Sequence, residues 1–263
     1  MPEDSFQRKL AIANYLIKST PINEVKYSLD DVNKLVQDPK VMKSISDTTL
    51  LSYNMTQYVH ADVSKSKRLL MTPYNNIANT NIFYDYDLNS CYEVNQVTKE
   101  ASSVSTPTIP ALSPQVAAFR SEVNKALQAY ISKYYIDNKC VSGIFVDGDR
   151  LVVCLSAINT NLNVYWTGNI RATYILPMNS GTQKLEGKIE TVVHYFEEGN
   201  VQLHCSYTVD EKNGSSYVTT SPESFIKAVT IVESNWMSNL ESMYITMHED
   251  TFKRMRRRLP IRG

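Results

Sequence analysis

Apolar residues recur at helical spacing through the first 58 residues and predict three short helices. Successive apolar side chains lie three or four positions apart, as they do on one face of a helix. The stripes are Phe6, Leu10, Ala13, Leu16 and Ile17; Val32, Leu35 and Val36; and Val41, Met42, Ile45, Leu50, Leu51 and Met55. We therefore expect an up-and-down bundle over residues 4–58, which buries all three stripes.

Residues 60–114 show no helical period. Asn, Tyr and Asp dominate Thr72–Tyr92, and short apolar patches such as Ile82–Tyr84 suggest small strands, so this region is expected to form hairpins and loops. Ser102–Pro114 contains three prolines among Ser and Thr, which predicts an extended connector. Helical spacing resumes over residues 115–137 and predicts a further helix.

Alternation with a period of two dominates residues 140–209 and predicts an antiparallel meander of about five strands. A two-residue turn at Asp147-Gly148 is expected to join the first two strands, because glycine readily adopts positive φ. Asn163–Leu176, Leu185–Phe196 and Val201–Val209 are the remaining strands. In Val201–Val209 apolar and polar residues alternate strictly, so one face of this sheet should be covered and the other polar.

The last predicted element is a long amphipathic helix over residues 221–259. Ser221 suits the cap, Pro222 suits the first turn, and an apolar stripe follows. A straight helix from Pro222 to Arg258 would span about 55 Å, whereas a compact globule of 263 residues is about 47 Å across. Part of the stripe should therefore overhang and contact another chain, unless the helix bends back within a monomer.

The overhang predicts a dimer interface on the helix stripe. The residues assigned to it are Trp236, Leu240, Met243 and Met247. A five-strand meander also leaves an edge strand that a partner can extend. The sequence therefore favours a subunit of an assembly.

The composition indicates a soluble globular protein. Hydrophobic residues make up 43% of the chain, and no apolar run approaches the roughly 18 residues of a membrane span. The polar N-terminus does not resemble a secretory signal, so an intracellular location is expected. The four widely spaced cysteines are expected to be reduced, although a disulfide between Cys140 and Cys205 stays open.

No set of side chains in the sequence indicates catalysis. The four histidines lack metal-ligand spacing, although His194 and His204 could face each other across a hairpin, as ordinary surface pairs also do. Glycine-rich phosphate loops and nucleophile motifs are absent. We therefore predict that the protein is not an enzyme and carries no cofactor and no metal.

The end of the last predicted helix is strongly basic, although the formal net charge of the chain is zero. The basic side chains are Lys253, Arg254, Arg256, Arg257 and Arg258. The helix dipole stabilises one or two such cations, by roughly 0.3 to 1 kcal/mol each. Five neighbouring cations repel one another by more than this unless an acidic partner is near, so the cluster predicts a binding surface.

Two stretches of the sequence resemble the α subunit of F-actin capping protein. One is VHYFEEGNV at residues 193–201, where the family has Asp in place of Glu198. The other is FKRMRRRLP at residues 252–260, where the family usually has Ala or Glu at position 254 and Leu at position 255. Weaker similarities follow in the family's order at Tyr53–Met55, Arg120–Tyr130 and Trp166–Arg171.

This resemblance implies an α+β subunit with an N-terminal helical bundle, a central antiparallel sheet and a long helix packed across it. It also implies a dimer with a similarly folded β subunit that caps barbed ends of actin filaments and blocks both addition and loss of actin. Such a protein belongs in the cytoplasm, on the cytoskeleton. Pairing of this chain with itself is an alternative, and the filament could be actin or an actin-related polymer.

The resemblance also implies roles for the basic residues. Family residues that contact actin carry over to Lys253, Arg256 and Arg257, whereas Arg254 and Arg258 are added only because they are close. Phosphoinositides oppose capping in this family, and the same cations could bind their headgroups. Family members continue after the Leu-Pro step into an amphipathic tail that strengthens capping, and this sequence ends at Gly263, so tight capping is not expected from it alone.

A basic-tail module for anionic lipid or nucleic acid is the alternative function. Its binding would weaken steeply with salt. Neutral overall charge and the lack of aromatic residues between the arginines argue against nucleic acid, because stacking platforms are missing.

Overall fold

The structure, a computed structural model, describes residues 2–178, 185–197, 200–209, 221–246 and 260, with side chains from residue 5 to residue 242 and at 260. It contains two compact units, Met1–Ile109 and Pro110–Gly263. The division falls within the predicted connector, Ser102–Pro114. Each unit is described below by itself.

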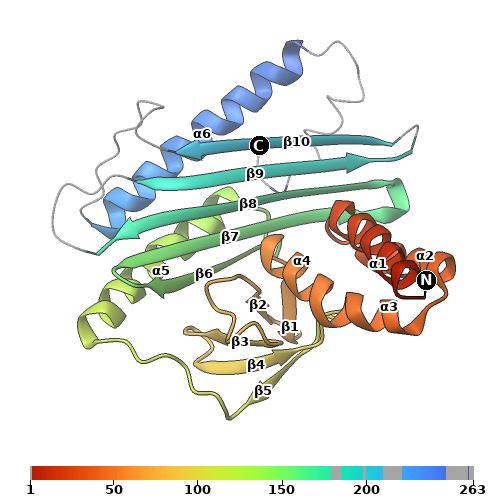
Figure 1. The fold of residues 1–263 in the computed structure, drawn as a ribbon. Coiled ribbons are helices and arrows are strands. Elements are labelled where there is room, and N and C mark those ends of the chain that lie inside the picture. The colour runs from red at the N-terminus through yellow and green to blue at the C-terminus, as the bar shows by residue number, and fades with distance from the viewer. Residues whose placement is uncertain (1, 179–184, 198–199, 210–220, 247–259, 261–263) are drawn as a thin grey trace. The chain divides into compact units, whose positions relative to one another are not determined.

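Unit 1 begins with the predicted helical bundle. Its elements are α1 (Pro2–Ser19), α2 (Val25–Val36), α3 (Pro39–Ser44), η1 (Ile45–Thr49) and α4 (Leu50–Thr56), shown in red and orange in Figure 1. The predicted stripes largely face inward, because Ala13, Val32 and Val41 are almost completely buried. Leu35, which was assigned to the second stripe, is instead 75% exposed, so the buried face of α2 runs through Val32 and Val36. The helical N-terminal part of the fold is therefore confirmed.

The third helix of the bundle contains one wide turn that the sequence pattern did not predict. Residues 45–49 form a π-helical segment, in which the amide of Leu50 donates to the carbonyl of Ile45. A regular helix places residues four apart on one face, whereas this wide turn brings Ile45 and Leu50, five apart, to the core. The turn therefore keeps both halves of the helix in contact with α1.

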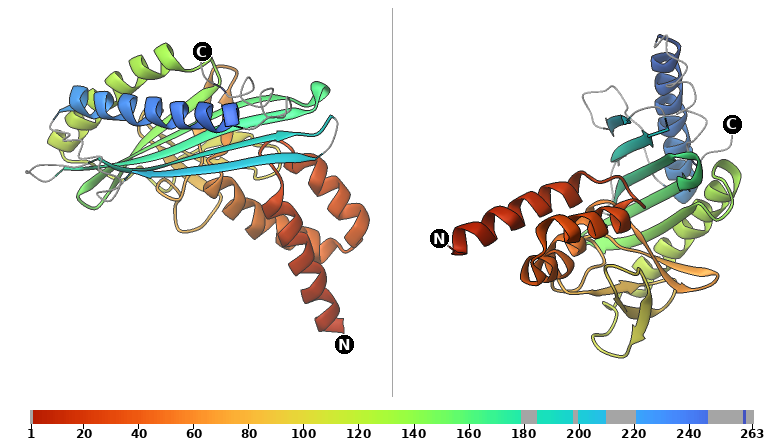
Figure 2. Two further views of the ribbon diagram at one scale, coloured as in Figure 1. Left: turned by 90° about the horizontal axis from the view of Figure 1, so that it is seen from above. Right: turned by 90° about the vertical axis from the view of Figure 1, so that its right-hand side faces the viewer.

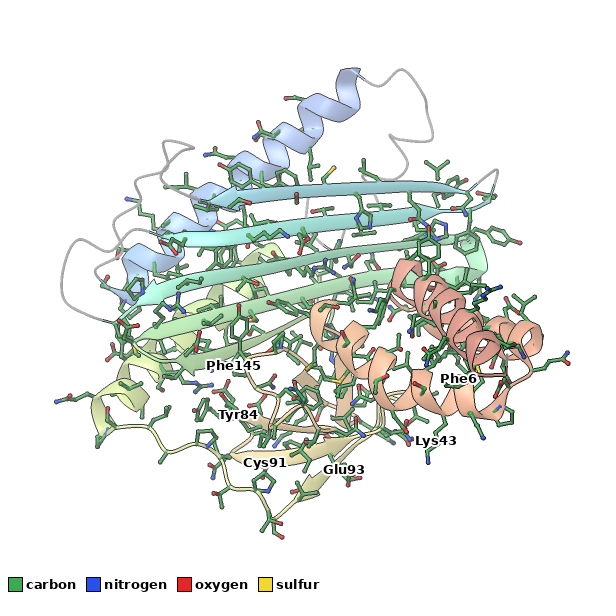
Figure 3. The ribbon with its side chains drawn as sticks, in the orientation of Figure 1. Phe6, Lys43, Tyr84, Cys91, Glu93 and Phe145 are labelled. Carbon is green, nitrogen blue, oxygen red and sulfur yellow. The ribbon has the colours of Figure 1, made fainter. Side chains whose placement is uncertain are left out.

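Unit 1 continues into two small sheets, as expected from the loop-rich sequence. The strands β1 (His60–Ser64) and β2 (Lys67–Leu70) pair with each other. The strands β3 (Ile82–Asp85), β4 (Ser90–Val94) and β5 (Ala101–Val104) form an antiparallel meander. Tyr84 and Cys91 are direct partners across β3 and β4 and are labelled in Figure 3.

Asn75 organises the segment between these two sheets. Its side chain is completely buried, and its amide nitrogen donates to the carbonyls of Leu70 and Tyr84, both at 2.9 Å. Its side-chain oxygen accepts from the backbone amide and the hydroxyl of Thr72, at 2.9 and 2.8 Å. One asparagine thus satisfies four polar groups that burial would otherwise leave unpaired.

Replacing Asn75 with alanine is expected to destabilise unit 1 by about 2 to 3 kcal/mol, because buried backbone groups lose their partners. Chemical unfolding of the full chain measures this loss, and hydrogen exchange of residues 70–84 localises it. Asn33→Ala is the matched control, because Asn33 is exposed on α2. Equal stability of the two variants would contradict the organising role of Asn75.

Unit 2 contains the predicted five-strand antiparallel sheet. Its strands are β6 (Cys140–Asp147), β7 (Arg150–Asn161), β8 (Trp166–Pro177), β9 (Glu186–Tyr195) and β10 (Val201–Val209). They lie in the order β10-β9-β8-β7-β6, so consecutive strands are neighbours. The order confirms the predicted meander, with β10 and β6 at its two edges.

The turn between β6 and β7 lies one residue later than predicted. Asp147 pairs with Arg150 in the register, and their side chains form an ion pair at 3.2 Å, so the two-residue loop is Gly148-Asp149. Gly148 adopts φ +63°, a backbone conformation that residues other than glycine rarely adopt. The prediction placed glycine second in the loop, whereas the structure needs it first.

Two helices cover one face of this sheet. The helices α5 (Pro114–Tyr134) and α6 (Pro222–Thr246) lie on the same side, as Figure 2 shows from above. Val123 and Leu127 of α5 join Val229 and Val232 of α6 and the inward-facing residues of β6 to β10 in one core. The α+β fold class with a helix packed across the sheet is therefore confirmed.

Candidate functional site

Most of the predicted binding residues lie outside the described part of the chain. These are Lys253, Arg254, Arg256, Arg257, Arg258 and Met247. The helix α6 is described up to Thr246, so its predicted continuation to Leu259 also lies outside. Met243 lies within α6, but its side chain is not described. Their assigned roles stay predictions, and the described residues show how the preceding helix is held.

Trp236 and Leu240, which the sequence assigned to a dimer interface, pack inside their own chain. They are 8% and 2% exposed and belong to the core of unit 2. The Trp236 ring stacks on Tyr207 with centroids 5.7 Å apart, and its indole nitrogen donates to the Thr191 hydroxyl at 3.2 Å. Because the sheet already covers both side chains, little of their surface is left for a partner. A contact of this stripe with another chain is untested.

The N-terminus of α6 is fixed by the signals that predicted it. The Ser221 hydroxyl accepts a hydrogen bond from the Ser224 amide at 3.2 Å, and Pro222 occupies the first turn. Glu223 lies in the same turn, where the helix dipole favours a negative charge. The start of the helix is therefore determined locally, before any packing on the sheet.

Sequence reasoning missed a polar cluster under α6. Three tyrosine hydroxyls donate to the Glu233 carboxylate: those of Tyr130 and Tyr135 to Oε2 at 2.5 and 2.7 Å, and that of Tyr174 to Oε1 at 2.7 Å. Tyr130 lies in α5, Tyr135 caps its end, and Tyr174 lies in β8. The carboxylate therefore ties α6 to α5 and to the sheet.

A signal for this cluster was present in the sequence. Glu233 lies four residues after Val229 and three before Trp236, so it shares their helical face and could not point fully into solvent. Burial raises the pKa of Glu233, and hydrogen bonds from the three tyrosines oppose that rise. Burial, followed by the nearby Glu233 charge, raises the pKa of Tyr130. The tyrosines therefore stay protonated donors.

The end of α5 also contacts the chain beyond the basic segment. Pro260 is buried, and its carbonyl accepts a hydrogen bond from the Ile136 amide at 3.3 Å. Ile136 directly follows Tyr135, which donates to Glu233. The end of α5 therefore contacts both Glu233 of α6 and Pro260.

The strand β10 forms one edge of the sheet and pairs only with β9 among the described strands. On one face its polar residues are exposed, and on the other its apolar residues are buried or half-buried, which confirms the predicted alternation. Cys205 and Tyr207 are half-buried although they face the helices. Among the described strands β10 therefore forms a sheet edge beside partly covered apolar side chains, and sheet edges are surfaces that a further strand can extend.

The sheet face opposite α5 and α6 carries an ion-pair cluster. The Arg171 guanidinium donates to Glu190 at 2.8 Å, and the Lys188 amine donates to the other carboxylate oxygen at 2.9 Å. Burial favours a higher pKa for Glu190, but these two hydrogen bonds and the two positive charges outweigh it and lower the pKa to about 2. Glu190 therefore stays ionised far below neutral pH.

We expect Glu190 to stabilise the fold by about 1 kcal/mol above pH 4.5. Because its folded pKa lies below the usual 4.5, this stabilisation should be lost as the pH falls towards about 2. Urea unfolding of wild type and Glu190→Gln should therefore differ at pH 7 and converge at low pH. Glu186→Gln, an exposed position on the same strand, is the control. A difference that does not change with pH would contradict the role of the charge.

The described histidines and cysteines do not form a metal site. His194 lies opposite Gln202 and His204 opposite Val192, so the two histidines do not face each other as the sequence suggested, because the hairpin register separates them. His194 hydrogen-bonds Asn200 instead, at 2.9 Å. All four cysteines are free thiols, which excludes the Cys140–Cys205 disulfide in this structure. Within the described residues no group of His, Cys, Asp or Glu could hold a metal ion.

In the described ranges, no helix is both long enough and apolar enough to cross a bilayer.

Comparison with known proteins identifies related sequences over nearly the whole chain. The family model described as F-actin capping protein alpha subunit matches residues 13–263. The F-actin-capping protein subunit alpha of Caenorhabditis elegans is 28% identical over 99% of this chain and 93% of its own length. The subunit from Aspergillus oryzae is 29% identical over 95% and 89%, and that from Dictyostelium discoideum is 26% identical over 98% and 92%.

Comparison with solved structures supports the same fold. The homodimeric actin capping protein alpha subunit from Plasmodium berghei superposes with a TM-score of 0.66. The match covers 90% of each chain at 12% sequence identity. At that identity the likeness concerns the fold.

Proposed function

Because this chain belongs to the F-actin capping protein alpha subunit family, we propose that it caps the barbed ends of actin filaments and blocks both addition and loss of actin. The observation that carries this proposal is the family match over residues 13–263, which extends across the sheet, α6 and the basic segment. The alternative of a basic-tail module for lipid or nucleic acid has no support from the related proteins. The proposed role is binding, without catalysis, in the cytoplasm and on the cytoskeleton.

The basic residues supply the proposed contact with actin. The resemblance of residues 252–260 assigns Lys253, Arg256 and Arg257 to contact with an acidic surface of actin, and Arg254 and Arg258 add charge beside them in the sequence. Positive charge at one end of the molecule accelerates encounter with an acidic surface and orients the two proteins. Phosphoinositide headgroups compete for the same cations in this proposal.

The proposed active form is a dimer, with a β subunit or with a second copy of this chain. The position of β10 supports this proposal, because this strand is the last in the order of the described sheet and sheet edges can pair with a strand of another chain. A partner strand would also cover Cys205 and Tyr207, which are half-buried in the single chain. Light scattering of the purified chain, alone and after co-expression with a capping protein β subunit, measures which dimer forms.

A seeded elongation assay tests the proposed function. Fluorescent actin is added to pre-formed filament seeds, and growth at barbed ends is followed with the purified chain alone and with the co-expressed β subunit. We expect at least one of the two preparations to stop barbed-end growth and to leave pointed-end growth unchanged. Unchanged barbed-end growth with both preparations would overturn the proposal.

A further inference from the structure

The cluster around Glu233 fixes the helix that leads into the basic segment. A carboxylate that accepts three hydroxyl donors at 2.5 to 2.7 Å forms short, charge-assisted hydrogen bonds, which are stronger than neutral ones. Within the described ranges this carboxylate has no ion-pair partner, so the tyrosines are its stabilising contacts. Breaking the cluster leaves hydroxyls of Tyr135 and Tyr174, two fully buried side chains, without their acceptor.

The cluster lies at the end of α5 that also contacts the chain beyond the basic segment. Glu233, in the middle of α6, binds Tyr130 and Tyr135 at the end of α5. Ile136, the next residue, binds the carbonyl of Pro260. The end of α5 therefore contacts α6 at Glu233, before the described end of that helix at Thr246, and contacts the chain again at Pro260.

We propose that Glu233 is a positioning residue for filament-end binding, which acts by holding α6 at the end of α5, where Pro260 is also bound. The proposal rests on the capping function proposed above. Glu233 itself does not contact actin in this account. It fixes the position of α6 on the sheet, and the chain continues from α6 to the basic residues.

The substitution Glu233→Gln tests this role with little change in shape. Glutamine has one acceptor oxygen where glutamate has two. Its amide nitrogen, which cannot accept, must therefore face either the hydroxyl of Tyr174 or the hydroxyls of Tyr130 and Tyr135. At least one charge-assisted bond is lost. In seeded elongation with the preparation that caps, we expect the concentration for half-maximal capping to rise roughly ten-fold, which corresponds to about 1.4 kcal/mol.

A second pair of variants removes a tyrosine hydroxyl and keeps the aromatic ring. Tyr174→Phe removes one donor to Glu233 and should weaken capping in the same direction. Tyr134→Phe is the matched control, because the Tyr134 hydroxyl forms no hydrogen bond with a described residue and its ring contacts are retained. Weakening by Tyr134→Phe equal to that by Tyr174→Phe would contradict the assignment. In the double variant, Glu233→Gln with Tyr174→Phe, the two effects should be less than additive.

A stability-matched variant distinguishes positioning from a general loss of folding. Val193→Ala removes buried methyl groups from β9 and should destabilise the same unit. Val193 pairs with Leu203 and Gly168 and with no residue of the Glu233 cluster. Capping is compared at a temperature where all variants are fully folded by circular dichroism. The proposal expects Glu233→Gln to cap poorly and Val193→Ala to cap like wild type. Equal capping by both, whether strong or weak, would overturn it.

Hydrogen exchange tests whether Glu233 holds α6, and this measurement does not depend on capping. In the full chain, Glu233→Gln should speed exchange of α6 amides at residues 229–240 at least ten-fold relative to wild type, with little change in β6 and β7. Unchanged exchange would contradict the role of Glu233 in holding α6. If wild type fails to cap, the positioning role for capping fails with the proposed function, and the exchange result still decides whether Glu233 holds α6.

Discussion

Replacing Lys253, Arg256 and Arg257 together with alanine is expected to weaken barbed-end capping by roughly 100- to 1000-fold. Each hydrogen bond to a charged group contributes about 1.5 to 3 kcal/mol, and every 1.4 kcal/mol changes affinity tenfold. Removing three such hydrogen bonds, with effects that are less than additive, gives this range. The measurement is seeded elongation over a series of protein concentrations, with and without added salt. The residual capping should depend less on salt than that of wild type, because fewer charges remain.

A control with the same change in net charge makes this prediction specific. Lys26, Lys40 and Lys125 are exposed lysines on α2, α3 and α5, far in sequence from the basic segment. Their simultaneous replacement by alanine also removes three positive charges. If the two triple variants cap equally, the assignment of the site to the basic segment is wrong, although capping itself would stand.

Trp236→Ala is expected to lower the free energy of unfolding of unit 2 by about 3 to 5 kcal/mol. The change removes a buried indole, its stacking on Tyr207 and its hydrogen bond to Thr191. Thermal or urea unfolding measures the loss, and capping should fall with it because α6 no longer packs firmly on the sheet. Trp236→Phe retains a ring without the donor and should lose less.

The same variant tests the interface that the sequence assigned to Trp236. If the indole acts only in its own core, the destabilisation should be the same across a wide range of protein concentrations. If the indole belongs to a dimer interface, Trp236→Ala should instead shift the dimer dissociation constant measured by light scattering. The 8% exposure of Trp236 favours the first result.

Elements with a strong period were predictable from the sequence. The strict alternation of Val201–Val209 and the apolar stripe after Pro222 led directly to β10 and α6, because burial of one face is the main determinant of both patterns. Overall length suggested an overhanging helix, but periodicity cannot show which surface covers a stripe. The stripe alone therefore assigned Trp236 and Leu240 to a partner, whereas both side chains pack in the core of their own chain.

Features that depend on polar contacts are harder to predict from the sequence. Asn75 stabilises its loop through partners 3 to 9 residues away, and no period marks it among the neighbouring asparagines. Glu233 lies on the buried face, but the sequence does not identify its partners, because they lie about 60 to 100 residues away. The basic segment itself was recognised from charge and resemblance, which identify residue types and leave their spatial arrangement open.

The wide turn at Ile45–Thr49 makes its helix more sensitive to the insertion of a residue than to the deletion of one. The turn accommodates one residue more than a regular helical turn between the two apolar halves. Deleting one exposed residue of this turn, such as Thr48, would let it close into a regular turn, and both halves would keep their buried faces. Inserting a further residue would instead rotate one half by about 100° and expose its apolar side chains. Related chains should therefore tolerate a shortened turn here and reject a lengthened one.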